Sequence, residues 1–397
     1  MQLKKLKVAI ICDAGFLTGT YTYSINVTEQ LSKLGCDVSL VTPVLLPDVK
    51  AKQLVLKWPF FKIPLIGRAS WLLTLYFRLY KYNFDIIQSS WYGMMNLLPC
   101  GLYKDKLRIT TLFDVAGDNK QFREGQLYLF IVTRILQPPH LRFNDFIITS
   151  SYRSKDQIIK LKGIASEKIG VTHLGVTDAF KRIKDKKMLS KAQKRLNLPE
   201  RFILNVGGIK ITRNSLRIVK AFSIIARKNP GISLVFSGKL DTTSKASKYH
   251  ELISQEIRRM EAGVRNRILF LNNVSRDELK AVYSLATVFL MPSLEEGFGL
   301  PLLEAMRAGV PAVTSKISCM PEVAGDAALL CNPYDTRDIA SKVERLLNDK
   351  ALAKKLSSKA EARAKTFTWE KTAKETIRIY EQEWRKKFGE KYVKYVL

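Results

Sequence analysis

The sequence contains no G-x-G-x-x-G motif, no P-loop and no apolar run near the roughly 20 residues that a membrane-spanning helix requires. The two missing motifs argue against dehydrogenase and kinase chemistry. The first apolar run, residues 8–12, is shorter than the roughly 7–15 apolar residues of a signal peptide. We therefore expect this run to be a first β-strand.

Cysteine and histidine are also scarce. The five cysteines are odd in number, show no C-x-x-C or Cys/His spacing, and are accompanied by three histidines. This pattern predicts reduced thiols in a cytoplasmic protein, with no disulfide framework and no zinc site. The cysteines are Cys12, Cys36, Cys100, Cys319 and Cys331.

Acidic residues are few: 36 Asp and Glu stand against 66 Lys and Arg, which gives a formal net charge of +30. Such a field attracts anions, among them phosphates, lipid headgroups and nucleic acid. A well-solvated basic surface and a role at an anionic membrane surface both remain open, and nucleic acid is the least favoured partner.

The 397 residues are too many for one ordinary core, so two domains are expected. Short apolar runs alternate with helical patterns through both halves of the chain, which favours two doubly wound parallel sheets, each covered by helices. The join lies in the basic stretch 171–200. The expected strands are 7–15, 36–43, 84–90, 107–115 and 145–151, then 201–208, 232–239, 267–274, 287–293, 311–315 and 327–333.

Ligands of open parallel sheets bind outside the carboxyl ends of the strands. Three glycine-bearing loops fall at such ends: "DAGFLTGTY", "NVGGIKITRN" and "SLEEGFG". In the third loop, glycines permit close approach of a ligand to the start of the helix near Leu300. Glu296 and Glu304 can each accept hydrogen bonds from a pair of hydroxyls, as sugars and riboses offer. The E-x7-E spacing alone fits a surface loop with solvated acids equally well.

The surrounding sequence decides between these alternatives. The stretches "PSLEEGFGLPLLEAMRAGVP", "MPEVAGDAALL" and "TFTWEKTA" strongly resemble the C-terminal half of family 4 retaining glycosyltransferases, which have the GT-B fold. The resemblance implies two Rossmann-like domains facing across a cleft. It also implies that Glu296 and the backbone of Phe298, Gly299 and Leu300 hold the donor sugar, and that Glu304 holds the ribose.

The stretch "NVGGIKITRN" resembles the phosphate loop of the same family. A departing diphosphate needs fixed cations and N–H donors. Arg213 takes the position of the phosphate-binding lysine, and Asn214, which opens the helix, is expected to contact the donor. Gly208 stands where some members carry a second arginine, so Lys210 or Lys239 is a candidate for that role.

Further matches concern the base and the acceptor side. The loop "LNNVS", which includes Val274, resembles the one whose backbone contacts the base. Gly19 matches a glycine loop that approaches the diphosphate. "TTLFDVAGD" resembles a strand that ends in His-Asp, but Phe113 replaces the histidine and Asp114 is kept. Either Phe113 is a packing wall and the reaction proceeds without an imidazole, or activity is reduced.

The resemblance also sets the expected domain limits. We expect an acceptor-side domain at residues 1–180, joined by a C-terminal helix at about 376–397, and a nucleotide-sugar domain at 181–375. Residues 57–84 and the last 15 residues combine aromatic residues with cations. This composition suits an anionic membrane face. The alternative is that the first segment is core and that the last helix packs back on the N-terminal domain.

The expected activity is retaining hexosyl transfer from a nucleotide diphosphate sugar to a saccharide acceptor. GDP-mannose is favoured slightly over UDP-glucose or UDP-N-acetylglucosamine. A lipid-linked acceptor in glycan, lipopolysaccharide or exopolysaccharide assembly is expected, on the inner face of the membrane. The chain has no D-x-D motif, so neither a metal nor another cofactor is expected. Two alternatives remain: a sucrose- or sugar-phosphate-type synthase, and a membrane- or nucleic-acid-binding protein on a decayed scaffold.

Overall fold

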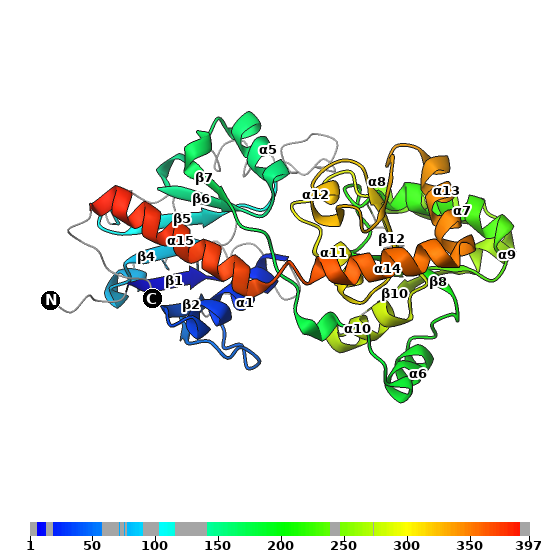
Figure 1. Cartoon of the computed structure of the whole chain (residues 1–397), viewed down its shortest axis with the longest axis horizontal. Coiled ribbons are helices and arrows are strands. Elements are labelled where there is room, and N and C mark those ends of the chain that lie inside the picture. Colours follow the sequence, from blue (N-terminus) through cyan, green and yellow to red (C-terminus); the bar gives the residue numbers. More distant parts are fainter. Residues whose placement is uncertain are drawn as a thin grey trace. The chain divides into compact units, whose positions relative to one another are not determined.

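The computed structural model describes residues 6–12, 19–57, 71, 75, 78–89, 103–115, 141–238, 247–272 and 274–389. The chain folds into two compact units (Figure 1). Unit 1 contains Met1–Gly175 and Thr368–Leu397, and unit 2 is Val176–Phe367.

The first boundary lies a few residues before the expected 180/181, because the segment after Gly175 is bound to unit 2. Asp178 pairs with Arg307 at 2.7 Å, and the rings of Phe180 and Tyr283 are 5.8 Å apart. The return to unit 1 also comes earlier than the expected position near 376. Thr368 caps the last helix by accepting the N–H of Lys371 at 3.1 Å, so the helix begins at the next residue.

Unit 1 is built on a parallel sheet with the strand order β3-β2-β1-β4-β5-β6-β7. Every described strand pair in this sheet is parallel, as the sequence predicts for doubly wound halves. Its elements are β1 (Lys7–Ile11), α1 (Gly19–Lys33), β2 (Asp37–Thr42), β3 (Gln53–Val55), η1 (Tyr80–Tyr82), β4 (Ile86–Ser89), β5 (Leu107–Thr111), β6 (Phe146–Thr149), α5 (Tyr152–Lys162), η6 (Ser166–Lys168), β7 (Ile169–Val171) and α15 (Trp369–Phe388).

Unit 2 is built on a second parallel sheet, with the order β10-β9-β8-β11-β12-β13. Helix α10 opens with a capping box, in which Ser275 and Glu278 exchange side-chain and backbone hydrogen bonds. The elements are η7 (Asp178–Phe180), α6 (Lys186–Arg195), β8 (Phe202–Val206), α7 (Ser215–Lys228), β9 (Ser233–Ser237), α8 (Lys248–Arg258), α9 (Ala262–Arg265), β10 (Ile268–Leu271), α10 (Arg276–Leu285), β11 (Val288–Met291), α11 (Leu300–Arg307), β12 (Ala312–Ser315), α12 (Met320–Ala324), β13 (Leu329–Cys331), α13 (Thr336–Asn348) and α14 (Lys350–Ala364).

The strand order of unit 2 explains where a ligand can bind. The chain builds outward from β8 through β9 to β10, then returns to place β11 on the other side of β8. This reversal is a topological switch point, and ligands of open parallel sheets bind beside such a point, outside the carboxyl ends of the strands. The loop after β8 holds the predicted phosphate residues, and the loop after β11 holds the predicted acids. The topology therefore brings these two sequence motifs together.

The described aromatic residues of the two basic segments are mostly core residues. Trp71, Leu75 and Phe84 pack in one buried cluster with β1 and β2. Tyr380 and Trp384 on α15 are also buried, and α15 contacts α1 and β5 of unit 1 (Figure 1). For these residues the packing alternative is correct, and the membrane-facing interpretation is not supported. Tyr392 and Tyr395 lie outside the described residues.

Of the described helices, none combines the length and the hydropathy that a membrane crossing requires. Four of the five cysteines are described. Cys12, Cys36, Cys319 and Cys331 are buried, and none of these four takes part in a disulfide.

Candidate active site

The loop between β8 and α7 is shaped around Arg213. Gly207 has a φ of 119°, and a Cβ atom at this position would lie 2.8 Å from Arg213 Cζ. The positive φ favours glycine, and a residue with a Cβ atom would also force the Arg213 guanidinium group to move. Asn214 has a φ of 61° and is buried, and its amide nitrogen donates to Pro292 O at 3.0 Å and to Pro333 O at 2.6 Å. The side chain that we expected to contact the donor thus ties three loops together.

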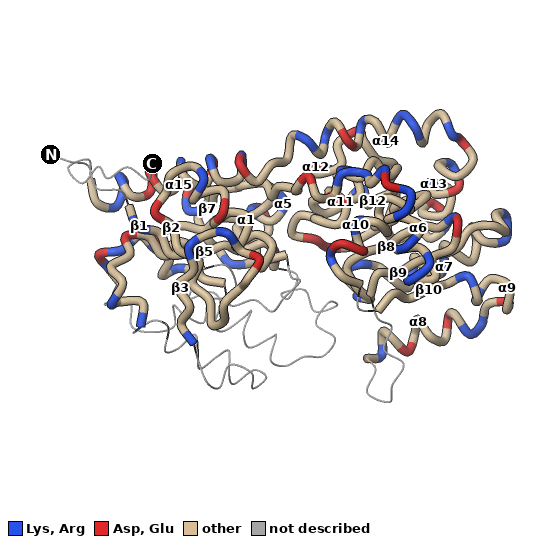
Figure 2. Tube along the Cα trace, turned by 90° about the horizontal axis from the view of Figure 1, so that it is seen from below, with Lys and Arg blue, Asp and Glu red and all other residues tan. Residues whose placement is uncertain are grey.

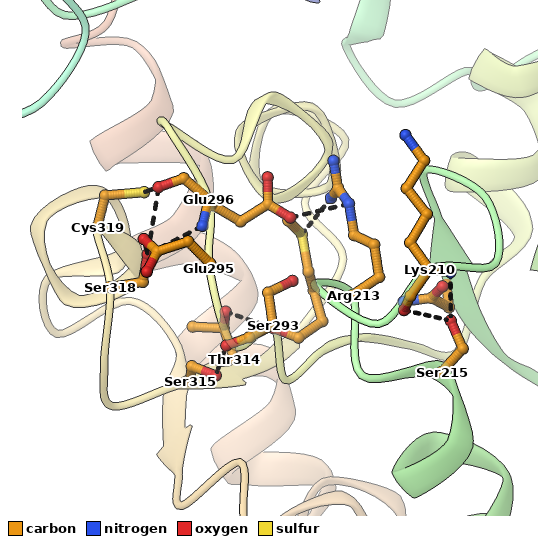
Figure 3. Close-up of polar contacts among 12 residues, drawn as sticks. Lys210, Arg213, Ser215, Ser293, Glu295, Glu296, Thr314, Ser315, Ser318 and Cys319 are labelled. Carbon is orange, nitrogen blue, oxygen red and sulfur yellow. Dashed lines mark hydrogen bonds and ion pairs between the residues drawn. The ribbon is translucent and has the colours of Figure 1, made fainter. Parts of the chain in front are cut away.

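The acidic loop after β11 lies directly against this loop. The N–H of Leu294 donates to Thr212 O at 2.8 Å. Glu296 forms an ion pair with Arg213, with 2.8 Å between Oε1 and Nε (Figure 3). The two side chains are only 10% and 15% exposed, so their attraction is less screened than that of a surface pair. The predicted sugar-binding acid and the predicted phosphate-binding cation are therefore neighbours.

The acidic loop leads into the start of α11. Gly299 has a φ of 91°, and a Cβ atom there would lie 2.2 Å from Met320 Cε, so this position requires glycine. The preceding residue, Phe298, is buried and packs against Phe367 with 5.8 Å between ring centroids. Leu300 begins the helix. Pro301 has no N–H, and the N–H groups of Leu302 and Leu303 donate to Gly299 O, so the first turn leaves the Leu300 N–H without a partner inside the helix. Such a helix start attracts anionic or polar ligand groups.

Glu304 lies one turn into α11 and accepts a hydrogen bond from the Tyr283 hydroxyl, at 2.8 Å from its Oε2. Burial raises the pKa of Glu304 to about 7, although the Tyr283 hydrogen bond and the charges of Arg276 and Arg213 act in the opposite direction. Burial and the neighbouring Glu304 raise the pKa of Tyr283 well above its usual value. Near neutral pH this acid therefore exists in both protonation states.

The other predicted donor residues are less constrained. Lys210 is exposed, and Figure 3 shows its side chain extending in the same direction as that of Arg213. Gly208 has a φ of 80° with open space where a Cβ would be. Val274 is half-buried immediately before α10. Lys239 lies outside the described residues.

On unit 1, Gly19 is the exposed first residue of α1, and Phe113 and Asp114 follow β5. The Phe113 ring packs edge-on against Tyr23, with 5.1 Å between centroids, and its carbonyl accepts the Ser154 hydroxyl at 2.6 Å. Phe113 and Asp114 are both half-buried. The aromatic ring is thus held in a defined position on unit 1.

Two residues in contact with the acids were not predicted from the sequence. Tyr283 has the periodicity of a core residue of α10, and nothing in the sequence distinguishes it from one. Ser318 lies between β12 and α12 and contacts the loop of Glu295 and Glu296 (Figure 3). Among the described residues, no three His, Cys, Asp or Glu side chains are grouped so as to hold a metal ion.

Comparison with known proteins extends this description. The family described as "Glycosyltransferase Family 4" matches residues 17–180, and "Glycosyl transferases group 1" matches residues 186–363. The chain belongs to the family 4 glycosyltransferases. The family matches therefore cover both units and include all the predicted site residues.

This family 4 glycosyltransferase is 30% identical over 233 residues to the serotype-specific mannosyltransferase WbdA of Escherichia coli. The match covers 58% of this chain and 28% of WbdA, so the chain spans less than a third of that relative's length.

Two solved structures are similar over nearly the whole chain. Sucrose-phosphate synthase from Thermosynechococcus elongatus gives a TM-score of 0.77 at 20% identity, covering 95% of this chain and 99% of the other. The HepE protein of Anabaena, in complex with UDP and glucose, gives a TM-score of 0.76 at 16% identity, covering 95% and 100%. At these identities the likeness establishes the GT-B fold.

Proposed function

We propose that this glycosyltransferase moves a hexose from a nucleotide diphosphate sugar to a saccharide acceptor. The observation that carries the proposal is the pairing of Arg213 with Glu296 at the switch point of the unit 2 sheet. A nucleotide sugar carries a diphosphate between a ribose and a hexose. A cation flanked by two hydroxyl-binding acids matches that order of groups.

Each residue then has a defined task. Arg213 stabilises the charge that builds up on the departing diphosphate, with Lys210 and Lys239 as additional cations. Glu296 and the N–H groups at the start of α11 bind the hexose, and Glu304 binds the ribose hydroxyls. Val274 contributes a backbone contact to the base. On unit 1, Gly19 permits approach of the loop to the diphosphate, and Asp114 is the polar group nearest the acceptor.

Mannose is the favoured hexose. The WbdA relative is a mannosyltransferase, which supports GDP-mannose as donor. HepE, whose structure contains UDP and glucose, supports UDP-glucose as the second candidate. We further propose retention of the anomeric configuration, with the departing phosphate taking the acceptor proton. In this scheme orientation and charge stabilisation are the protein's contribution, and Arg213 takes the place of a metal.

The acceptor that we propose is lipid-linked, with the enzyme bound at the cytoplasmic membrane face. The net charge of +30 supports this placement, because anionic headgroups attract a basic protein. Figure 2 shows Lys and Arg along elements of both units.

The experiment is a thermal-shift screen against GDP, UDP, ADP and their sugars, with EDTA present. A ligand that binds only the folded protein raises the melting temperature. We expect one nucleotide to give a clear shift and Glu304→Ala to abolish it. Arg213→Ala should reduce transfer roughly 100- to 1000-fold, as loss of a charge-stabilising group does.

A folded protein that gives no shift with any nucleotide would contradict the proposal. This result would favour the alternative of a decayed scaffold, which has lost glycosyl transfer and binds a membrane or nucleic acid. A shift that appears only in a parallel screen without EDTA would contradict metal independence alone.

A further inference from the structure

Ser318 has an unusual backbone for its residue type. Its φ is 61°, and it is one of four described non-glycine residues with positive φ. The other three are Asn83, Asn197 and Asn214, and asparagine tolerates this region better than other residues with a Cβ atom. Holding serine there costs about 1–2 kcal/mol. Glycine would avoid this cost. A serine at this position is therefore explained if its hydroxyl makes contacts that glycine cannot make.

The Ser318 hydroxyl lies against the acidic loop. Its oxygen accepts the backbone N–H of Glu296 at 3.0 Å. Its single proton has two acceptors in reach, Glu295 Oε1 at 3.0 Å and Glu296 O at 3.2 Å. The neighbouring Cys319 thiol also donates to Glu296 O, at 3.2 Å. Figure 3 shows these contacts on one side of Glu296 and Arg213 on the other.

Glu296 is therefore held at three points. Ser318 holds its N–H, Ser318 and Cys319 hold its carbonyl, and Arg213 holds its carboxylate. The first two contacts fix the backbone from which the carboxylate projects. A group placed from a fixed backbone does not have to be reorganised when a ligand binds.

We infer that Ser318 is a positioning residue, which sets the placement of Glu296 against the donor sugar. The inference rests on the proposed function, because it assigns Glu296 to the sugar. It separates the two acids: Glu304 is bound by the Tyr283 hydroxyl, whereas Ser318 contacts the loop of Glu295 and Glu296. Loss of the Ser318 hydroxyl should therefore weaken recognition of the sugar and leave recognition of the nucleotide intact.

The test compares two variants with a matched control. Ser318→Gly removes the hydroxyl and also the cost of the left-handed backbone, whereas Ser318→Ala removes the hydroxyl and keeps that cost. The control is Asn197→Gly, which makes the same kind of backbone change at an exposed residue after α6, where φ is 47°. The measurements are the melting temperature, the Kd of the nucleoside diphosphate, and kcat and KM with the nucleotide sugar.

We expect both Ser318 variants to lose about tenfold or more in kcat/KM, because small displacements of a positioned group are costly. The Kd of the nucleoside diphosphate should stay within about twofold of wild type. The loss of even one hydrogen bond to the nucleotide would change this Kd by more than that. Ser318→Gly should melt above Ser318→Ala, and Asn197→Gly should transfer sugar as wild type does.

Several results would overturn the inference. Unchanged kcat/KM in Ser318→Gly would show that the hydroxyl does not position Glu296. Parallel loss of melting temperature and nucleotide affinity in Ser318→Gly would make Ser318 a general stabilising residue. A wild-type protein that neither binds nor transfers any nucleotide sugar would remove the proposed function and this inference together.

Discussion

Glu304 is an acid whose surroundings favour its neutral form. Burial raises its pKa to about 7 from a usual 4.5, and the Tyr283 hydroxyl donates to its Oε2. A neutral carboxyl accepts fewer hydrogen bonds than a carboxylate does. The residue proposed to bind the ribose is therefore fully competent only above neutral pH.

This shift predicts a pH dependence with a definite sign. Between about pH 4.5 and 7, the folded protein keeps the Glu304 proton and the unfolded chain has lost it. The unfolded state then binds fewer protons, so Glu304 lowers the free energy of unfolding as the pH rises through this window. Nucleotide affinity should rise over the same window as the carboxylate forms.

The measurement is the melting temperature and the nucleotide Kd of wild type and Glu304→Gln between pH 5 and 8. Glutamine is neutral throughout, so any phosphate ionisation affects both proteins equally. Identical pH profiles for the two proteins would show that Glu304 does not titrate in this range.

At the scale of elements, α15 is attached to unit 1 by a buried polar network. The Tyr380 hydroxyl donates to Gln88 Oε1, and Gln88 Nε2 donates to Tyr23 at 2.9 Å and to Thr111 at 2.7 Å. These four side chains come from α15, β4, α1 and β5 and are all buried. Because Tyr23 also packs on Phe113, the network holds the acceptor-side ring in place.

Tyr380→Phe should destabilise the protein by about 1–3 kcal/mol, because it leaves the buried Gln88 oxygen without its donor. The free energy of unfolding, from denaturant titration, tests this. Tyr82→Phe is the control, since Tyr82 is 43% exposed in the same unit. Equal stability of the two variants would mean that the network contributes nothing.

The elements themselves were largely predictable from the sequence, and the contacts between them were not. Short apolar runs, which alternate with helical patterns along the chain, identified β8, β11 and their neighbours. A strand in a buried parallel sheet is apolar along its whole length. Periodicity does not report partners, so it could not distinguish Tyr283 from other core residues of α10. Trp71 was open to a membrane interpretation for the same reason. Ser318 was missed because its role depends on a left-handed φ that no local motif indicates.

At the scale of the whole molecule, the basic charge is not evenly placed. Residues 181–195 hold eight exposed Lys and Arg side chains and one acid, Asp185, which caps α6. Arg195 forms an ion pair with Glu278, and together with the Arg307 hydrogen bond the charge of Lys181 helps to lower the pKa of Asp178. A cationic helix face of this kind suits the anionic membrane proposed as a partner.

Lys187, Lys191 and Lys194 lie at i, i+4 and i+7 on α6, which places them on one face. Changing all three to Glu should weaken binding to vesicles of phosphatidylcholine and phosphatidylglycerol by about tenfold or more, since each cation near such a surface contributes about 1 kcal/mol. Vesicle co-sedimentation at fixed ionic strength measures this. The matched control changes Lys350, Lys354 and Lys355 of α14, which are also exposed.

Equal losses in the two triple variants would assign vesicle binding to the net charge instead of α6. If neither triple variant changes vesicle binding, the proposed membrane contact of α6 is contradicted, and α14 makes no such contact either.

The chain leaves unit 1 after Gly175 and returns to it at Thr368. During synthesis on the ribosome, the whole of unit 2 is therefore available before α15 emerges. Domains generally fold as units while the chain is being made. Unit 2, with its proposed nucleotide-binding edge, can thus complete its core before Tyr380 is available to bond with Gln88 of unit 1. The order of translation therefore lets unit 2 mature before unit 1.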